Sequence, residues 1–136
     1  IKIANGSKLT LKQDEIEFNG CAMECRINAE DPDKEFMPSP GKVLDYIAPG
    51  GPGIRLDTHV YHGYEVSPYY DSMLGKLIVH GKKRTEVIDR MLRALGEYVI
   101  GPIKTTIPFH KEVLNNPRFR RGQVTTDFVD TLFAEK

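Results

Sequence analysis

The chain has 136 residues, enough for one domain with a hydrophobic core, and it carries 19 basic and 19 acidic residues. This balance gives no overall electrostatic field that would attract nucleic acid or a membrane surface. No apolar run reaches the roughly 18 residues that a membrane-spanning helix needs. We therefore expect neither a membrane span nor a nucleic-acid partner.

The start of the chain and the two cysteines bear on the cellular compartment of the protein. The sequence shows no signal peptide and does not begin with Met, so we expect a cytoplasmic fragment of a longer protein. Cys21 and Cys25 would lie about 13 Å apart on one strand, which is too far for a disulfide. Their spacing does not match a zinc site either. We expect free thiols and no metal site.

The N-terminal half predicts extended structure. Residues 1–4 fit the end of a helix that stops at Asn5-Gly6, and residues 9–18 fit a short extended segment. A turn is expected at 30–33 and a rigid proline loop at 36–41. Alternating or β-rich composition predicts four strands, the last of them central in the sheet: 21–29, 43–47, 54–61 and 73–81.

The C-terminal half predicts helices. An apolar stripe runs from Arg84 to Ile100, where Gly101-Pro102 would end the helix, and Thr85 is expected to cap its start. After a short strand at 103–105, a second helix is expected from Thr106 to Asn115, and a third begins after Thr125 or Thr126. Strands before helices are typical of an α+β fold, here an antiparallel, barrel-sandwich-like β-sheet packed against C-terminal helices.

The predicted strand 54–61 carries the candidate site. Arg55 follows the turn Gly50-Gly51-Pro52-Gly53 and is well placed to present a flat, permanently charged fork to an anion. Asp57 would lie on the same face about 7 Å away, where it could hold the guanidinium. His59 and Tyr61 would extend this polar row. The alternative interpretation is a solvated outer face.

Lys76 lies between Gly75 and Leu77 in the predicted central strand. Its apolar stem could extend along the surface so that the ammonium reaches water. Alternatively, the ammonium pairs with a carboxylate such as Asp71. We take Lys76 and Asp71, with Asp57, as candidate supporting residues for the Arg55 site.

Several long motifs carry a family resemblance. GGPGIRLDTHVYHGYEVSPYYDSMLGKLIVHG, AMECRINAEDP, FMPSPGKV and IKTTIPFH resemble the C-terminal domain of biotin carboxylase. The resemblance covers nearly the whole chain, so residues 1–136 are interpreted as this domain. The biotin-carboxylase N-terminal and ATP-grasp domains of the family lie upstream and are absent from this chain. It departs from the family at Gly20-Cys21 and at Gly101-Pro102, and neither departure touches Arg55.

The resemblance implies a part in the ATP-dependent carboxylation of carrier-bound biotin by bicarbonate. Arg55 takes the position of the family's catalytic arginine, which binds biotin and bicarbonate. Thr126 aligns with a residue that touches the adenine of the nucleotide. The resemblance implies ATP, Mg and biotin as cofactors of the full-length enzyme. None is expected on the fragment alone, which should be inactive.

The same resemblance implies partners and a parent enzyme. The partners would be a biotin carboxyl carrier protein, a carboxyltransferase component and a second copy in a homodimer, with contacts near His80 to Arg84. The expected parent is the acetyl-CoA carboxylase of fatty acid synthesis. Pyruvate carboxylase or another acyl-CoA carboxylase is an alternative parent. A noncatalytic protein-interaction module is the alternative from a different class.

Overall fold

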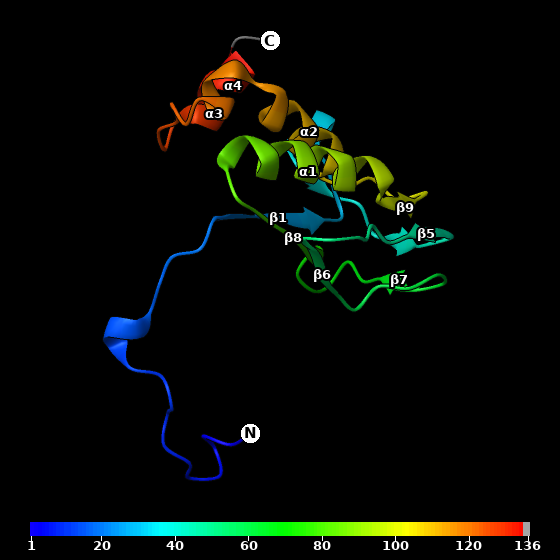
Figure 1. Cartoon of the computed structure of the whole chain (residues 1–136). Helices are drawn as coiled ribbons and strands as arrows, with labels where there is room; N and C mark the ends of the chain where they lie inside the picture. The colour runs from blue at the N-terminus through cyan, green and yellow to red at the C-terminus, as the bar shows by residue number, and fades with distance from the viewer. Residues whose placement is uncertain (135–136) are drawn as a thin grey trace.

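The computed structural model describes residues 1–134, in which strands form a layer covered on one face by helices (Figure 1). The strands are β1 (Cys21–Asn28), β2 (Glu30–Asp31), β3 (Met37–Pro38), β4 (Gly41–Lys42), β5 (Asp45–Ile47), β6 (Ile54–Thr58), β7 (Glu65–Val66), β8 (Met73–Gly81) and β9 (Val99–Gly101). The helices are α1 (Arg84–Glu97), α2 (Ile107–Asn115), α3 (Pro117–Arg120) and α4 (Phe128–Ala134), with short 3-10 turns η1 (Gln13–Glu15) and η2 (Pro32–Lys34). This arrangement confirms the predicted α+β class.

The main sheet has three antiparallel strands in the order β1-β8-β6, so β8 is central, as its composition predicts. Period-two alternation sends one set of side chains from these strands toward the helices. Ile27, Leu77 and Val79 are fully buried there. The apolar stripe of α1 packs against them and supplies the other half of the core: Val87, Ile88, Met91, Ala94 and Leu95.

The predicted strand 43–47 is split, because the chain changes partners within it. The amide of Val43 donates to the carbonyl of Tyr64 at 2.8 Å, and the amide of Leu44 donates to the carbonyl of Gly101 at 2.7 Å. Accordingly β4 pairs with β7, whereas β5 pairs with β9. These pairings join segments far apart in sequence, so local alternation gives no sign of the break.

The predicted end of the first helix at Ile100 is wrong. Helix α1 ends at Glu97, and the amide of Tyr98 closes its last turn on the carbonyl of Ala94. The next residues, Val99 to Gly101, form β9, because β5 offers their backbone a pairing partner. β-branched side chains such as those of Val99 and Ile100 suit this extended conformation.

The start of α1 also differs from the prediction. Thr85 does not cap it; instead the carboxylate of Glu86 accepts the amide of Lys82 at 2.8 Å. Glu86 also forms an ion pair with Arg90, one turn further along the helix, at 2.8 Å.

The spacing of Asp89 and Arg93, four residues apart on α1, would suit an ion pair, but the two do not pair with each other. Asp89 instead pairs with Arg120 of α3 at 2.8 Å, and Arg93 pairs with Glu97 at 2.6 Å. Sequence spacing alone could not show that an arginine of another helix competes for Asp89.

Helix α2 begins after Thr106 and ends before Pro117, as expected. The hydroxyl of Thr106 does not cap the helix, because it bonds to β1: it accepts the amide of Asn28 at 3.0 Å and donates to the carbonyl of Arg26 at 3.2 Å. Residues 103–105 form a loop rather than the expected strand. The short helix α3 was not predicted.

The proline loop at 36–41 contains β3, which pairs with β2, and η2 occupies part of the expected turn. Glu35 and Phe36 both adopt left-handed backbone angles, with φ of 50° and 57°. The ring of Phe36 packs edge-on against Phe109 of α2, with centroids 5.1 Å apart. This contact anchors the loop to the helical layer.

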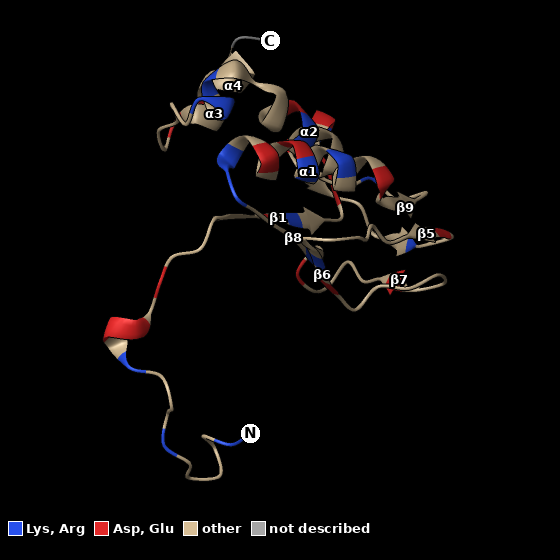
Figure 2. Ribbon diagram, viewed as in Figure 1, with Lys and Arg blue, Asp and Glu red and all other residues tan. Residues whose placement is uncertain are grey.

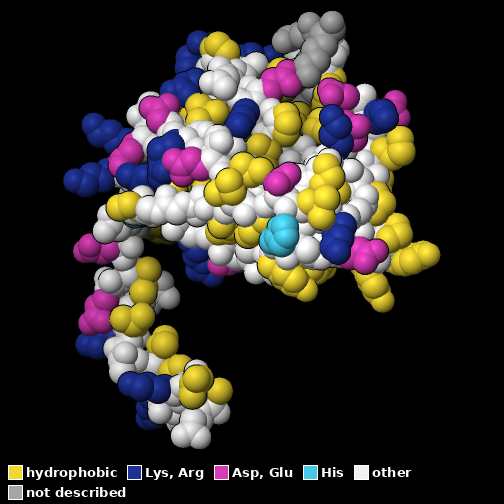
Figure 3. Space-filling model, turned by 90° about the vertical axis from the view of Figure 1, so that its right-hand side faces the viewer, with side chains coloured by type: hydrophobic (Ala, Val, Ile, Leu, Met, Phe, Trp, Pro, Cys, Tyr) yellow, Lys and Arg dark blue, Asp and Glu magenta, His cyan; other side chains and the backbone are white. Residues whose placement is uncertain are grey.

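The first 20 residues extend away from the body and expose apolar side chains, as the space-filling view shows (Figure 3). Residues 2–6 form turns rather than the end of a helix, and residues 9–18 are extended around η1, largely as expected. Phe18 is fully exposed at 104% of its reference surface. None of the helices within residues 1–134 has the length and apolar character needed to cross a membrane.

The core of β8 can be tested with Leu77→Ala. Leu77 lies on the central strand and its side chain is fully buried in the core, so the truncation removes apolar contacts and leaves a cavity. We expect a loss of about 2–5 kcal/mol in the free energy of unfolding, measured by urea denaturation. Leu44→Ala is the matched control, because Leu44 is 50% exposed and should cost far less. Equal costs would contradict the assigned core.

The two cysteines should differ in reactivity. Burial, with a smaller effect from the charge of Glu24, raises the pKa of the Cys25 thiol to about 12. At pH 8 a thiol reagent should therefore label the partly exposed Cys21 and leave Cys25 unmodified until the chain unfolds, as read by mass spectrometry. Fast labelling of native Cys25 would contradict its burial.

The same thiol predicts a dependence of stability on pH. The unfolded chain releases the Cys25 proton near its ordinary pKa of 9.0, while the folded chain holds it up to about 12. The folded state binds more protons in this interval, so the free energy of unfolding should fall as pH rises through it. Cys25→Ala should flatten this part of the curve, and an unchanged slope would contradict the assignment.

Candidate functional site

The face of the main sheet opposite α1 carries charged side chains from all three strands. The register sets them in two cross-strand rows, Glu24–Ile78–Arg55 and Arg26–Lys76–Asp57. We call the five charged residues of these rows the polar face: Glu24, Arg26, Arg55, Asp57 and Lys76. The candidate site on this face is Arg55 with Asp57 and Lys76, and Glu24 and Arg26 form a separate pair beside it. The strand pairing, rather than any loop, holds their backbones in place.

Arg55 and Asp57 form a two-point ion pair on β6. The guanidinium Nε donates to Oδ1 of Asp57 at 2.8 Å, and Nη2 donates to Oδ2 at 2.8 Å. The prediction that Asp57 holds the arginine is confirmed. Both side chains remain accessible, with 72% of Arg55 and 43% of Asp57 exposed. The pair is therefore ordered and open to solvent.

The pair also shifts both ionisation equilibria. The hydrogen bonds and charge of Asp57 raise the pKa of Arg55 above its ordinary value. In return, the hydrogen bond from Arg55 lowers the pKa of Asp57, and the charge of Lys76 lowers it further. Both groups stay charged at neutral pH, so the polar face keeps a fixed cation there.

Glu24 and Arg26 form the second pair of the polar face, with Nε and Oε1 3.8 Å apart. Their side chains are 42% and 67% exposed, so this pair is a surface ion pair.

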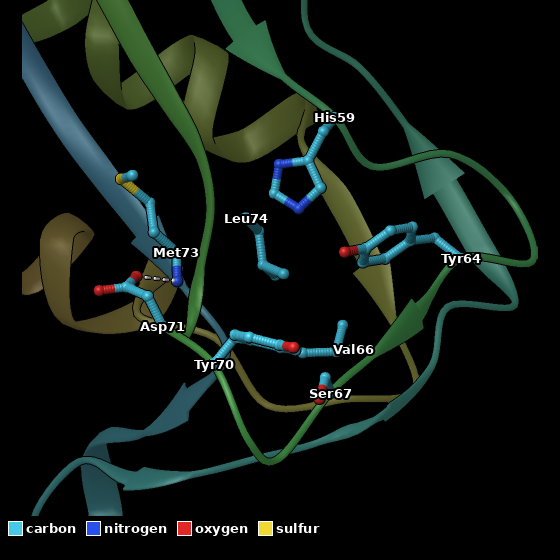
Figure 4. A pocket seen from close by; sticks show the side chains of 8 residues that line it. All are labelled: His59, Tyr64, Val66, Ser67, Tyr70, Asp71, Met73 and Leu74. Atoms are coloured by element: carbon cyan, nitrogen blue, oxygen red, sulfur yellow. Dashed lines mark hydrogen bonds between the residues drawn. The ribbon is translucent and has the colours of Figure 1, made fainter.

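Lys76 is half-buried on β8 and lies directly across from Asp57 in the register. The alternative that it pairs with Asp71 is wrong. Asp71 precedes the strand, and its carboxylate accepts the amide of Met73 at 2.7 Å, as Figure 4 shows. No Lys76–Asp71 ion pair forms within residues 1–134. The structure therefore brings Lys76, but not Asp71, to the Arg55 pair.

His59 and Tyr61 do not extend the polar row. Strand β6 ends at Thr58, whose hydroxyl donates to the carbonyl of Leu74 at 2.7 Å and accepts the amide of Val60 at 3.0 Å. These bonds turn the chain out of the strand. The ring of His59 instead packs edge-on against Tyr64, with centroids 5.0 Å apart.

A cavity of about 340 Å³ lies beyond the end of β6. Figure 4 shows the rings of His59, Tyr64 and Tyr70 around this hollow, with Asp71 at its margin. Its remaining lining residues are Val66, Ser67, Met73 and Leu74. The sequence shows a run rich in Tyr and His here, but the cavity also needs the chain to pass through β7 and return along β8, which alternation does not reveal.

Thr126 lies apart from the polar face. It is exposed in the turn before α4, and Figure 1 places α4 on the far side of α1 from β6. Helix α4 begins at Phe128, whose amide donates to the carbonyl of Thr125. The structure does not bring Thr126 and Arg55 together, and the assignment of Thr126 to nucleotide binding stays a prediction.

Basic residues also gather outside the polar face. Figure 2 shows basic residues at the start of α1 and on α3, and several have local partners. Arg84 donates to the carbonyl of Phe119 at 2.6 Å, and Arg120 pairs with Asp89. Within residues 1–134, no three His, Cys, Asp or Glu side chains cluster as a metal site requires.

Comparison with known proteins finds relatives that match nearly the whole chain, this site included. A family model described as "Biotin carboxylase C-terminal domain" matches residues 24–131, which include the whole polar face. "Biotin carboxylase 1" of Bacillus subtilis is 54% identical over 131 residues, covering 96% of this chain and 29% of that protein. A pyruvate carboxylase component of Methanothermobacter thermautotrophicus is 54% identical over 130 residues, covering 96% and 26%. The chain thus spans less than a third of the length of these relatives.

Solved structures agree with the fold. The structure of the biotin carboxylase component of a pyruvate carboxylase superposes with a TM-score of 0.94 at 45% identity, covering 98% of this chain and 30% of that one. The biotin carboxylase domain dimer of Hydrogenobacter thermophilus 2-oxoglutarate carboxylase, in complex with MgADP, ADP and bicarbonate, gives 0.93 at 45% identity, with coverages of 96% and 29%. From its sequence and its fold, the chain belongs to the biotin carboxylase C-terminal domain family.

Proposed function

We propose that residues 1–136 are the C-terminal domain of a biotin carboxylase and contribute to the ATP-dependent carboxylation of carrier-bound biotin by bicarbonate. Family membership supports the reaction. The observation that carries the role of this chain is the two-point ion pair of Arg55 and Asp57 on the open face of the sheet. It presents an ordered, accessible cation, which is what an anionic reaction partner requires.

The proposed role of Arg55 follows from the charge that develops in the reaction. When a ureido nitrogen of biotin loses its proton to a base, the ureido oxygen becomes enolate-like and negative. The nitrogen then attacks the carboxyl carbon of carboxyphosphate, the bond from that carbon to the phosphate oxygen breaks, and inorganic phosphate leaves. A guanidinium beside the ureido oxygen stabilises the transition state more than the ground state, and so accelerates the step. Arg55 can also bind bicarbonate through the same donors. The general base would belong to another part of the enzyme.

ATP and Mg²⁺ are assigned mainly to the rest of the enzyme. ATP supplies the activated phosphate that makes bicarbonate reactive. The ATP-grasp region of the family lies outside this chain, so we place Mg²⁺ there, where one or two carboxylates and the phosphates of ATP would hold it. Thr126 would approach the adenine from the turn before α4.

The proposed parent is the acetyl-CoA carboxylase of fatty acid synthesis, acting as a homodimer with a biotin carboxyl carrier protein and a carboxyltransferase component. The solved domain dimer from H. thermophilus supports the dimer. We place the enzyme in the cytoplasm, which suits two free thiols. A relative named "Biotin carboxylase, chloroplastic" from Arabidopsis thaliana shows that family members also occur in another compartment.

Pyruvate carboxylase is the second candidate parent. The pyruvate carboxylase component of M. thermautotrophicus and the biotin carboxylase of B. subtilis are both 54% identical to this chain. Identity therefore favours neither parent. The biotin half-reaction is common to both, so the proposed role of Arg55 is the same in either enzyme.

Arg55→Ala tests the proposal in the full-length carboxylase that contains this chain. Biotin- and bicarbonate-dependent ATP hydrolysis should fall at least about tenfold, and as much as about 10²–10³-fold, because the transition-state charge loses its donor. The melting temperature should hold, because the ion pair is exposed.

Arg26→Ala is the matched control, since Arg26 is a similarly exposed, ion-paired arginine on the same face. It should keep turnover near that of the wild type. If Arg55→Ala also keeps full turnover, the catalytic proposal fails and the alternative of a protein-interaction module gains support.

A further inference from the structure

The Arg55–Asp57 pair leaves only part of the guanidinium available. A guanidinium has five N–H donors in one plane: one on Nε and two on each Nη. Asp57 accepts from Nε and from Nη2, each at 2.8 Å, and so occupies one whole side of the fork. The donors that remain are both N–H groups of Nη1 and the second of Nη2. One N–H of Nη1 and the free N–H of Nη2 form the Nη1–Nη2 edge, which can still bind two coplanar acceptors, while the other N–H of Nη1 points back toward Cδ.

Asp57 is held so that it can define this orientation. It lies two residues from Arg55 on the same face of β6, and β8 pairs with both positions, opposite Ile78 and Lys76. Lys76, across from Asp57, adds a cation that favours the charged carboxylate. Both partners therefore project from a paired strand, which places side chains more precisely than a loop does.

We propose that Asp57 is a positioning residue that fixes the plane of the Arg55 guanidinium and leaves only its Nη1–Nη2 edge to receive an oxygen-centred anion. This inference rests on the proposed function. Two sources of that anion exist in the reaction, bicarbonate and the enolate-like ureido oxygen of biotin. Without Asp57 the arginine keeps its charge but loses its fixed orientation, and misplacement on the order of 1 Å can cost about a hundredfold in rate.

Three substitutions distinguish a loss of guanidinium orientation from a mere loss of negative charge on the polar face. Asp57→Asn keeps one acceptor oxygen but puts an NH₂ group where the second stood, so it cannot receive both guanidinium donors. Asp57→Glu keeps both oxygens on a longer side chain. Glu24→Gln is the matched control, because it removes the same charge from the same face at the same exposure, 42% against 43%.

The kinetic experiment uses the full-length carboxylase and measures kcat and KM for bicarbonate and for biotin. Asp57→Asn should lower kcat/KM by about tenfold to a hundredfold, Asp57→Glu should recover part of the loss, and Glu24→Gln should stay within about twofold of the wild type. A raised KM for bicarbonate would assign the edge to bicarbonate. A lowered kcat with unchanged KM values would assign it to the ureido oxygen. If Asp57→Asn matches Glu24→Gln, the proposal is overturned.

A second measurement needs no catalysis. In the ¹⁵N NMR spectrum of this chain, the Arg55 guanidinium should rotate slowly and show separate Nη signals, because Asp57 holds two of its nitrogens. Asp57→Asn should merge these signals, whereas Glu24→Gln should not. Merged signals in the wild type would refute the positioning role.

The two proposals can fail separately. If Arg55→Ala leaves turnover intact, the proposed function falls whatever the NMR spectrum shows. If Arg55 is required for turnover but Asp57→Asn changes neither the kinetics nor the NMR signals, only the positioning role is refuted.

Discussion

The pairing of β8 with a strand on each side is the constraint on which the rest of the structure depends. Because β1 and β6 both pair with β8 in a fixed register, alternate residues of all three strands are buried under α1 and the others face outward. Leu77 and Val79 fill the core from the same strand that presents Lys76 outward. A shift of one residue in either pairing would exchange these faces. The core and the polar face are therefore specified by the same hydrogen bonds.

The polar face contributes little to the stability of the fold. Exposed ion pairs such as Arg55–Asp57 and Glu24–Arg26 are screened by water, whereas the buried stripe of α1 removes apolar surface from it. A charged face that the fold does not need is free to serve recognition. This separation explains why substitutions at Arg55 and Asp57 are suited to test function without unfolding the protein.

The features that could be predicted from the sequence are those that depend on residues close together in the chain. The Arg55–Asp57 pair was predictable because both residues lie on one strand, where spacing determines which side chains meet. The split at Val43 was not, because its cause is a change of partner between distant segments. The link from Asp89 to Arg120 has the same long-range origin. Roles that depend on residues outside the chain stay predictions.

Strand β6 lies at one end of the three-stranded order, so one side of its backbone has no partner within that sheet. Such an unpaired rim is a template on which a second copy could add a strand, and soluble proteins counter this with charged side chains. Arg55 and Asp57 are two of the five residues of β6. A neutral replacement of both would leave a short strand of Ile, Leu and Thr beside the new side chains. The charges that mark the proposed site thus also oppose self-association along this rim.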